Sequence, residues 1–166
     1  MCAVDVIVIA GSPGSGKSAL MDALAASLPG WPPRIEFSDL REWHLDRLWE
    51  RQSETEEAVA FENVLFVIDN YLRHGMTPVL VTDFREHRIS DLVERYGTKV
   101  LLVTLFAPAA AIRDRIDARH DGFTNVAAAV EWNKREMERP LRQGEQRFDT
   151  SAASTASIVE TLMQVL

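Results

Sequence analysis

The sequence predicts an α/β fold in which five parallel strands form a sheet covered by helices on both faces. Three observations lead to this prediction. Short apolar, β-branched runs alternate with longer segments whose apolar residues have helical spacing. The runs at 78–83 and 99–106 contain few polar residues, as is typical of strands buried on both faces. A glycine-rich turn at 11–16 joins the first strand to the first helix. Together they favour a helix, sheet, helix layering.

Each element follows from its local pattern, with breaks at prolines and glycines such as Pro29, Gly75, Gly97 and Pro108. Strands are expected at 4–10, 34–38, 78–83, 99–106 and 147–150. Helices are expected at 17–28, 40–52, 53–74, 86–96, 109–119, 124–138 and 154–166. Because no repeat, low-complexity tract or linker divides the chain, we expect one domain over residues 1–166.

The glycine-rich turn carries a complete phosphate-binding motif. Residues 11–18 read Gly-Ser-Pro-Gly-Ser-Gly-Lys-Ser, which matches G-x-x-x-x-G-K-[ST] at every fixed position. Backbone N–H groups of such a turn can surround phosphate oxygens, and the helix N-terminus adds about half a positive charge. Lys17 is expected to reach the β- and γ-phosphates and the Ser18 hydroxyl to bind Mg²⁺. The motif predicts a nucleoside triphosphate site in a three-layer P-loop NTPase fold. The residues expected to contact the nucleotide are Gly11, Ser12, Pro13, Gly14, Ser15, Gly16, Lys17, Ser18 and Ala19.

Composition narrows the classes of function. The net charge of −7 disfavours broad, sequence-independent binding to nucleic acid, which depends on clustered Lys and Arg. Cys2 is the only cysteine, so no internal disulfide is possible, and this suits a reducing cytoplasm. No apolar stretch approaches the about 20 residues that a membrane-spanning helix needs, and the N-terminus leads directly into the first strand without room for a signal peptide. We therefore expect a cytoplasmic protein with no membrane partner.

Asp83 follows the apolar Val-Leu-Val-Thr run at the end of an expected strand. A hydrophobic strand that ends in an acid places a carboxylate beside the phosphate loop. There it can bind Mg²⁺, directly or through water, opposite Ser18. The alternative is a turn or N-cap role for the following helix.

Asp39 is expected at the end of the short second strand, 34–38. Ligands of open α/β sheets bind beyond the carboxyl ends of the strands, so Asp39 could accept the proton of an attacking hydroxyl. The alternative is the N-cap of a helix that begins at Leu40, and the two roles can coexist.

Arginines are concentrated in the second half of the chain. Arg115 and Arg119 are four residues apart and share one helix face, where one guanidinium could stack on an adenine and the other could approach the γ-phosphate. Asp114 and Asp117 leave open a solvated, salt-bridged face instead.

Two further sets of arginines are candidates for the site. Arg41 and Arg85 each lie two residues past a strand-end aspartate and could contact the phosphoryl acceptor. Arg135, Arg139 and Arg142 form a cluster that could close over phosphates or could be surface charge.

These features resemble the small P-loop kinases of the adenylate kinase-like group, which includes gluconate kinase and shikimate kinase. The resemblance rests on the motif at 11–18 and on the strand that ends at Asp83. In addition, Arg-Ile-Asp-Ala-Arg at 115–119 resembles the lid segment of such kinases. Phe-Asp-Thr-Ser at 148–151 resembles the loop that borders the adenine, which implies contacts from its last two residues, Thr150 and Ser151. Asp39 falls where several members keep a carboxylate that faces the acceptor hydroxyl.

The resemblance implies the strand order 2-3-1-4-5, a mobile helical lid over about 109–145, ATP as the phosphoryl donor and a requirement for Mg²⁺. The predicted reaction is γ-phosphate transfer to a hydroxyl of a small molecule, with Lys17, Asp39, Arg115 and Arg119 as the catalytic set. No strict gluconate or shikimate acceptor signature is present, so sugar acids, nucleosides, nucleotides and antibiotics all stay open as acceptors. The alternatives are a nucleotide-dependent switch or other P-loop NTPase, and a nucleic-acid kinase. We expect a monomer or a homodimer.

Overall fold

The computed structural model describes residues 4–44, 54–119 and 122–166, with the backbone alone described at 42–44. Within these residues, five strands form one sheet in the order β2-β3-β1-β4-β5, and every neighbouring pair is parallel. The predicted strand order is therefore confirmed. The strands are β1 (Val6–Gly11), β2 (Arg34–Glu36), β3 (Val79–Thr82), β4 (Val100–Phe106) and β5 (Gln146–Asp149).

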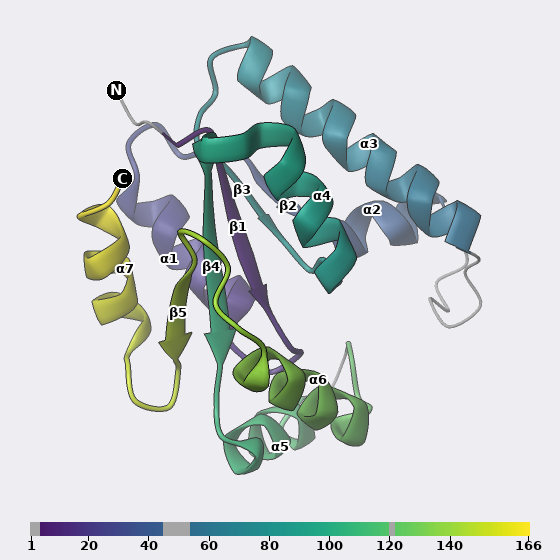
Figure 1. The fold of residues 1–166 in the computed structure, drawn as a ribbon, viewed down its shortest axis with the longest axis vertical. Coiled ribbons are helices and arrows are strands. Elements are labelled where there is room, and N and C mark those ends of the chain that lie inside the picture. Colours follow the sequence, from purple (N-terminus) through teal and green to yellow (C-terminus); the bar gives the residue numbers. More distant parts are fainter. Residues whose placement is uncertain (1–3, 45–53, 120–121) are drawn as a thin grey trace.

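Helices cover both faces of the sheet (Figure 1). Val6 and Val8 of β1 face a core shared with the α3 and α4 side, whereas Ile7 and Ile9 face the core shared with α1 and α7. This alternation explains why β1 is apolar at every position, since neither of its faces meets water. The four covering helices are α1 (Lys17–Ser27), α3 (Glu54–Arg73), α4 (Glu86–Tyr96) and α7 (Thr155–Met163).

The remaining helices lie at the carboxyl ends of the strands. α5 (Ala109–Asp117) and α6 (Val126–Glu138) pack on each other through a small separate core and lie beyond the tips of β1 and β4 (Figure 1). A short 3-10 turn, η2 (Gly97–Lys99), leads into β4. None of the described helices is long and apolar enough to cross a membrane.

The second strand and second helix differ from the sequence prediction. β2 ends at Glu36, and α2 (Phe37–His44) begins at once instead of at residue 40. The reason is Phe37, which is buried between the rings of Phe61 and Phe84, with centroids 6.1 and 5.1 Å away. The rest of the expected helix 40–52 lies outside the described residues.

This difference corrects the prediction for Asp39. Asp39 does not end a strand and does not cap a helix that starts at Leu40, because it already lies in the first turn of α2. Its side chain is exposed there. The residue that ends the strand is Glu36.

Candidate nucleotide and acceptor site

The phosphate-binding motif connects β1 to α1 as a tight loop. Gly16 is the N-cap of α1 with φ +99°, and no side chain caps the first N–H groups of the helix. The N-terminal amides of α1 therefore have no side-chain acceptor, and an anion at this end of the helix could accept their hydrogen bonds. Gly11 has no room for a side chain, since a Cβ atom there would lie 2.4 Å from the carbonyl oxygen of Leu105 and 2.6 Å from Ser15 Oγ.

Lys17 is buried at the start of α1 and its ammonium group turns back over the loop. Its Nζ donates a hydrogen bond to the Ser12 carbonyl at 3.1 Å and lies 3.3 Å from Asp83 Oδ1. Ser18, the next residue, is exposed. The structure thus brings the loop lysine together with Asp83, because β1 and β3 are neighbours in the sheet.

Asp83 has an unusual backbone conformation. Its φ is +72°, in the left-handed region that residues other than glycine adopt at a cost of order 1–3 kcal/mol, mainly at functional sites. The Ser38 hydroxyl donates a hydrogen bond to Asp83 Oδ2 at 2.9 Å. Asp83 is not the N-cap of the following helix, because that position of α4 is Arg85. The N-cap alternative for Asp83 is therefore wrong.

Glu36 is a half-buried carboxylate that the sequence interpretation missed. Burial raises the pKa of Glu36, the negative charges of Asp83 and Asp39 raise it further, and Lys17 opposes the shift. The signal was present in the sequence, since a carboxylate at the end of a strand lies at the ligand-binding edge of the sheet. Placing that end required the structure.

A cavity of about 380 Å³ lies beside the phosphate loop. Its lining residues come from the loop and α1, β4, α5, and the segment from β5 to α7: Gly14, Gly16, Ala19, Leu20, Leu105, Arg115, Arg119, Thr150, Ala153, Ser154, Thr155 and Ile158. Of the adenine-loop residues expected from the sequence, Thr150 lines this cavity. Ser151 does not line it, and its N–H and hydroxyl both donate to Asp149 Oδ1.

Arg115 connects the two sides of this cavity. It donates to the Gly14 carbonyl at 3.1 Å, to Thr150 Oγ1 at 2.8 Å and to the Thr150 carbonyl at 2.9 Å. The Thr150 hydroxyl in turn donates to the Ser15 carbonyl at 3.1 Å. Arg119 lines the same cavity with an exposed side chain, but it lies after the end of α5 at Asp117 and not, as predicted, on the helix that carries Arg115. The two arginines therefore differ in their contacts, because Arg115 already makes three hydrogen bonds, one to the phosphate loop and two to Thr150.

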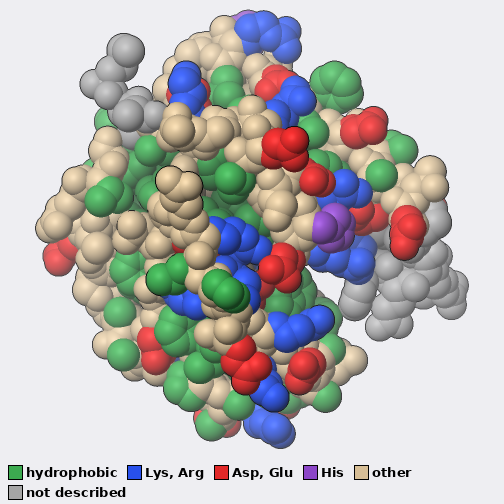
Figure 2. Space-filling view, in the orientation of Figure 1, with side chains coloured by type: hydrophobic (Ala, Val, Ile, Leu, Met, Phe, Trp, Pro, Cys, Tyr) green, Lys and Arg blue, Asp and Glu red, His purple; other side chains and the backbone are tan. Residues whose placement is uncertain are grey.

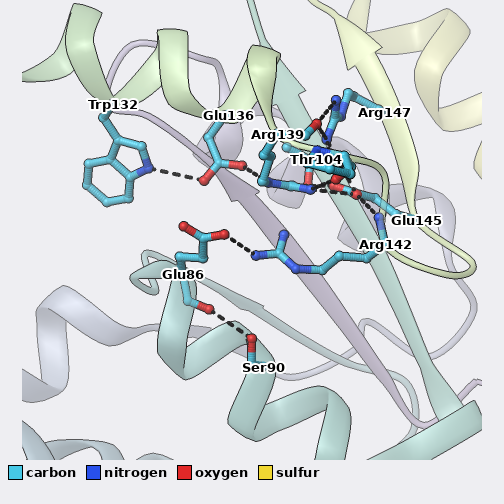
Figure 3. A network of polar contacts seen from close by, with 10 residues as sticks. Glu86, Ser90, Thr104, Trp132, Glu136, Arg139, Arg142, Glu145 and Arg147 are labelled. Atoms are coloured by element: carbon cyan, nitrogen blue, oxygen red, sulfur yellow. Dashed lines mark hydrogen bonds and ion pairs between the residues drawn. The ribbon is translucent and has the colours of Figure 1, made fainter.

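The second arginine cluster divides into different roles. Arg135 is exposed, which is compatible with both alternatives given for it. Arg139 is held between two carboxylates: its Nε donates to Glu136 Oε2 at 2.7 Å, and its two Nη atoms donate to the two oxygens of Glu145 (Figure 3). Arg142 forms an ion pair with Glu86 Oε1 at 3.1 Å. Arg139 is neither surface charge nor free to approach a phosphate in this structure.

Glu145 is the centre of this polar network (Figure 3). Its carboxylate is fully buried and also accepts from the Arg142 backbone N–H at 2.8 Å. Burial opposes the ionisation of Glu145, but the hydrogen bonds from Arg139, Thr104 and Arg142 outweigh it and lower its pKa to about 2. The network attaches the segment after α6 to Thr104 of β4.

The two arginines expected near the acceptor lie in the segments that follow β2 and β3. Arg41 is on α2, with its guanidinium 5.6 Å from the centre of the Phe37 ring. Arg85 is exposed immediately before α4. The described residues contain no group of three His, Cys, Asp or Glu side chains that could hold a metal ion by themselves. A Mg²⁺ ion that also binds phosphate oxygens needs fewer protein ligands.

Solved structures with the same fold include small kinases. A gluconokinase from Sinorhizobium meliloti 1021 is 18% identical and aligns over 99% of this chain and 93% of that chain, with a TM-score of 0.69. A shikimate kinase from Acinetobacter baumannii, in complex with shikimate, is 15% identical over 98% and 92%, with a TM-score of 0.66. The tunicamycin resistance protein of Deinococcus radiodurans is 20% identical over 97% and 94%, with a TM-score of 0.65.

These likenesses confirm the predicted resemblance to small P-loop kinases at the level of the fold. No curated protein shows significant sequence similarity to the chain. A family model described as an AAA domain (AAA_33) matches residues 6–140, from the start of β1 to just beyond α6, and the chain belongs to this family.

Proposed function

We propose that the protein is an ATP- and Mg²⁺-dependent kinase that transfers the γ-phosphate to a hydroxyl group of a small molecule. The observation that carries the proposal is the position of the Lys17 ammonium group. It lies over a complete phosphate loop, 3.3 Å from a carboxylate at the end of the neighbouring strand. Phosphoryl transfer depends mainly on positioning and on neutralising phosphate charge, and this arrangement supplies both. We also propose that the protein is a single domain, that it is a monomer or a homodimer, and that it is cytoplasmic.

The loop and the cavity fit a nucleoside triphosphate. The uncapped amides of α1 and Lys17 would bind the β- and γ-phosphates. The cavity beside the loop would hold the base, between the Arg115 and Arg119 side and the segment that begins at Thr150. In this proposal α5 and α6 belong to the lid segment 109–145, and the exposed Arg119 is free to turn toward bound ATP.

Ser18 and Asp83 would hold the Mg²⁺ ion. A hydroxyl and a carboxylate are the hard oxygen ligands that this ion prefers, and phosphate oxygens and water would complete its shell. The ion would neutralise charge that develops on the phosphates during transfer. Lys17 would move from Asp83 to the phosphates when the nucleotide binds.

The acceptor would bind at the edge formed by the ends of β2 and β3. We propose that Asp39 orients or deprotonates the acceptor hydroxyl, and that Arg41 and Arg85 contact the acceptor. Glu36 is a second candidate base, because burial raises its pKa and a carboxylate with a raised pKa is a stronger base than an ordinary one. Asp39→Asn and Glu36→Gln, compared at saturating ATP, distinguish the two by which one removes turnover.

Two other functions stay as rivals. A nucleic-acid kinase needs a basic track that leads to the pocket, but on the face in Figure 2 basic and acidic side chains are interspersed. A nucleotide-dependent switch would bind ATP in the same loop without a phosphoryl acceptor.

The test is ATP turnover with Mg²⁺, alone and with pools of sugars, sugar acids, nucleosides, nucleotides and hydroxylated antibiotics. Stimulation by one pool supports the kinase and identifies its acceptor class. Lys17→Ala should lower the stimulated rate by several orders of magnitude, whereas the exposed Lys134→Ala should not change it. Full activity in Lys17→Ala would refute the assignment, and tight ATP binding that no pool stimulates would favour the switch.

A further inference from the structure

The carboxylate of Asp83 is shared between two partners. Oδ1 faces the Lys17 ammonium at 3.3 Å, and Oδ2 accepts the Ser38 hydroxyl hydrogen bond at 2.9 Å. These partners come from different helices, because Lys17 begins α1 and Ser38 lies in the first turn of α2. A carboxylate held at both oxygens has a fixed orientation.

A pair of stacked aromatic rings holds the backbones of Ser38 and Asp83 next to each other. Phe37 precedes Ser38 and Phe84 follows Asp83, and their rings stack with centroids 5.1 Å apart and planes inclined by 12°. Phe61 of α3 packs edge-on against both rings, at 6.1 and 5.9 Å. Both rings of the stack are almost completely buried. The two backbones that carry the hydrogen bond are therefore fixed by the core.

In the proposed function, nucleotide binding would change only one of the two contacts. Lys17 would turn toward the phosphates to act in phosphoryl transfer, and Asp83 Oδ1 would then lose its cation. Ser38 does not have to contact the phosphates, so its hydrogen bond to Asp83 Oδ2 can persist. It is then what keeps the carboxylate aimed while Oδ1 faces the phosphates and any ion bound to them.

We propose that Ser38 is a positioning residue that orients Asp83 for the divalent metal ion of the nucleotide complex. This inference rests on the proposed function, because it requires that Asp83 hold the metal of a bound nucleotide. It goes beyond that function in assigning a role to the hydroxyl of α2. Removal of a hydrogen bond that orients a metal ligand typically weakens metal affinity by 10–100-fold.

The experiment compares Ser38→Thr with Ser38→Val, which have the same shape and differ only in the hydroxyl group. Mn²⁺ replaces Mg²⁺, and electron paramagnetic resonance of free Mn²⁺ gives the dissociation constant of the metal from the protein–ADP complex, without turnover. Titration calorimetry with ADP in excess chelator measures metal-free nucleotide binding. Ser38→Ala repeats the comparison if the valine side chain does not fit, and Ser27→Ala is the matched control at the far end of α1, where the hydroxyl bonds only its own helix.

We expect Ser38→Val and Ser38→Ala to raise the Mn²⁺ dissociation constant about tenfold, with Ser38→Thr within about threefold of the wild type. Metal-free ADP binding should stay within about twofold in all variants, because the phosphate loop is untouched. Equal Mn²⁺ affinity in the threonine and valine variants overturns the inference, and so does an equal loss of metal-free and metal-dependent binding. Wild-type protein that binds neither ADP nor Mn²⁺–ADP would overturn the proposed function itself, so the two failures are distinguishable.

Discussion

Replacement of Glu145 by glutamine removes the charge at the centre of the network in Figure 3 and keeps the size of the side chain. The buried carboxylate of Glu145 accepts hydrogen bonds from both Nη atoms of Arg139, from Thr104 and from the Arg142 N–H. A glutamine would turn its NH₂ group toward one of these donors. The guanidinium of Arg139 would then keep only Glu136 as an ionised partner.

The pKa of Glu145 sets the expected size of the effect. Its value of about 2 in the folded protein, against 4.5 for an ordinary glutamate, corresponds to about 3 kcal/mol of stability when the group is ionised in both states. Because the folded pKa is lowered, this stability is present above pH 4.5 and is lost as the pH falls toward 2. The free energy of unfolding of the variant should therefore be about 3 kcal/mol below that of the wild type at pH 7. This difference should shrink by about 1 kcal/mol at pH 4 and by about 2 kcal/mol at pH 3. A change of this size lowers Tm by about 6–12 °C in a chain of this length.

The assay is urea unfolding followed by circular dichroism at pH 7 and pH 4, with thermal unfolding as a second measurement. Glu138→Gln is the matched control, because this glutamate ends α6, the helix that carries Glu136 of the network, but is exposed, with a loose pair to Lys134 at 3.9 Å. We expect no measurable change for the control at either pH. A loss of less than about 1 kcal/mol at pH 7 in Glu145→Gln, or a difference that does not shrink on acidification, would refute the reasoning.

Three further substitutions test the loop and the cavity, and a fourth, Gly75→Ala, is a control for the first. Gly11→Ala should unfold the protein or cost more than about 2 kcal/mol, because the new Cβ would lie 2.4 Å from a backbone oxygen; Gly75→Ala, with φ +72° but open space around it, should cost only about 1 kcal/mol in the same urea titration. Arg115→Lys should lower the urea midpoint with or without nucleotide, since one ammonium cannot replace a guanidinium that bonds a loop carbonyl and both oxygens of Thr150; an unchanged midpoint would contradict this role. Arg119→Ala should leave the midpoint unchanged and weaken ATP binding in calorimetry, and an unaltered ATP affinity would remove it from the proposed site.

Most of the fold follows from the sequence because the central strands are buried on both faces. β1 and β3 are completely buried, which favours apolar residues and makes these strands easy to identify, and the buried hydroxyl of Thr82 is satisfied by donating to the Ile9 carbonyl. The long helix predicted at 53–74 is observed as Glu54–Arg73, and its N-terminal turn is rich in glutamate as a helix start should be. The phosphate loop was predictable for a different reason, since its glycines have conformations that few other residues adopt.

The second strand was harder because long-range packing decides where it ends. Residues 34–38 alternate in a way that suits a strand of five residues, but Phe37 packs on Phe61 and Phe84, which lie far away in the sequence. That packing starts α2 early, moves Asp39 from a strand end to an exposed helix turn, and leaves Glu36 at the edge of the sheet. No local pattern contains this information.

The lid proposed for 109–145 is attached to the rest of the molecule at its beginning, middle and end. Arg115 bonds the phosphate loop, the buried amide of Asn133 accepts from and donates to the backbone of Ala107 at 3.2 and 2.6 Å, and Glu145 connects the final segment to Thr104. Each attachment is worth about 1–3 kcal/mol. If the lid moved as one rigid piece, all three attachments would break, and a few new contacts to ATP would not compensate for that loss. Closure over the nucleotide is therefore expected to use exposed side chains of the segment, such as Arg119, while the backbone of α5 and α6 stays close to its present place.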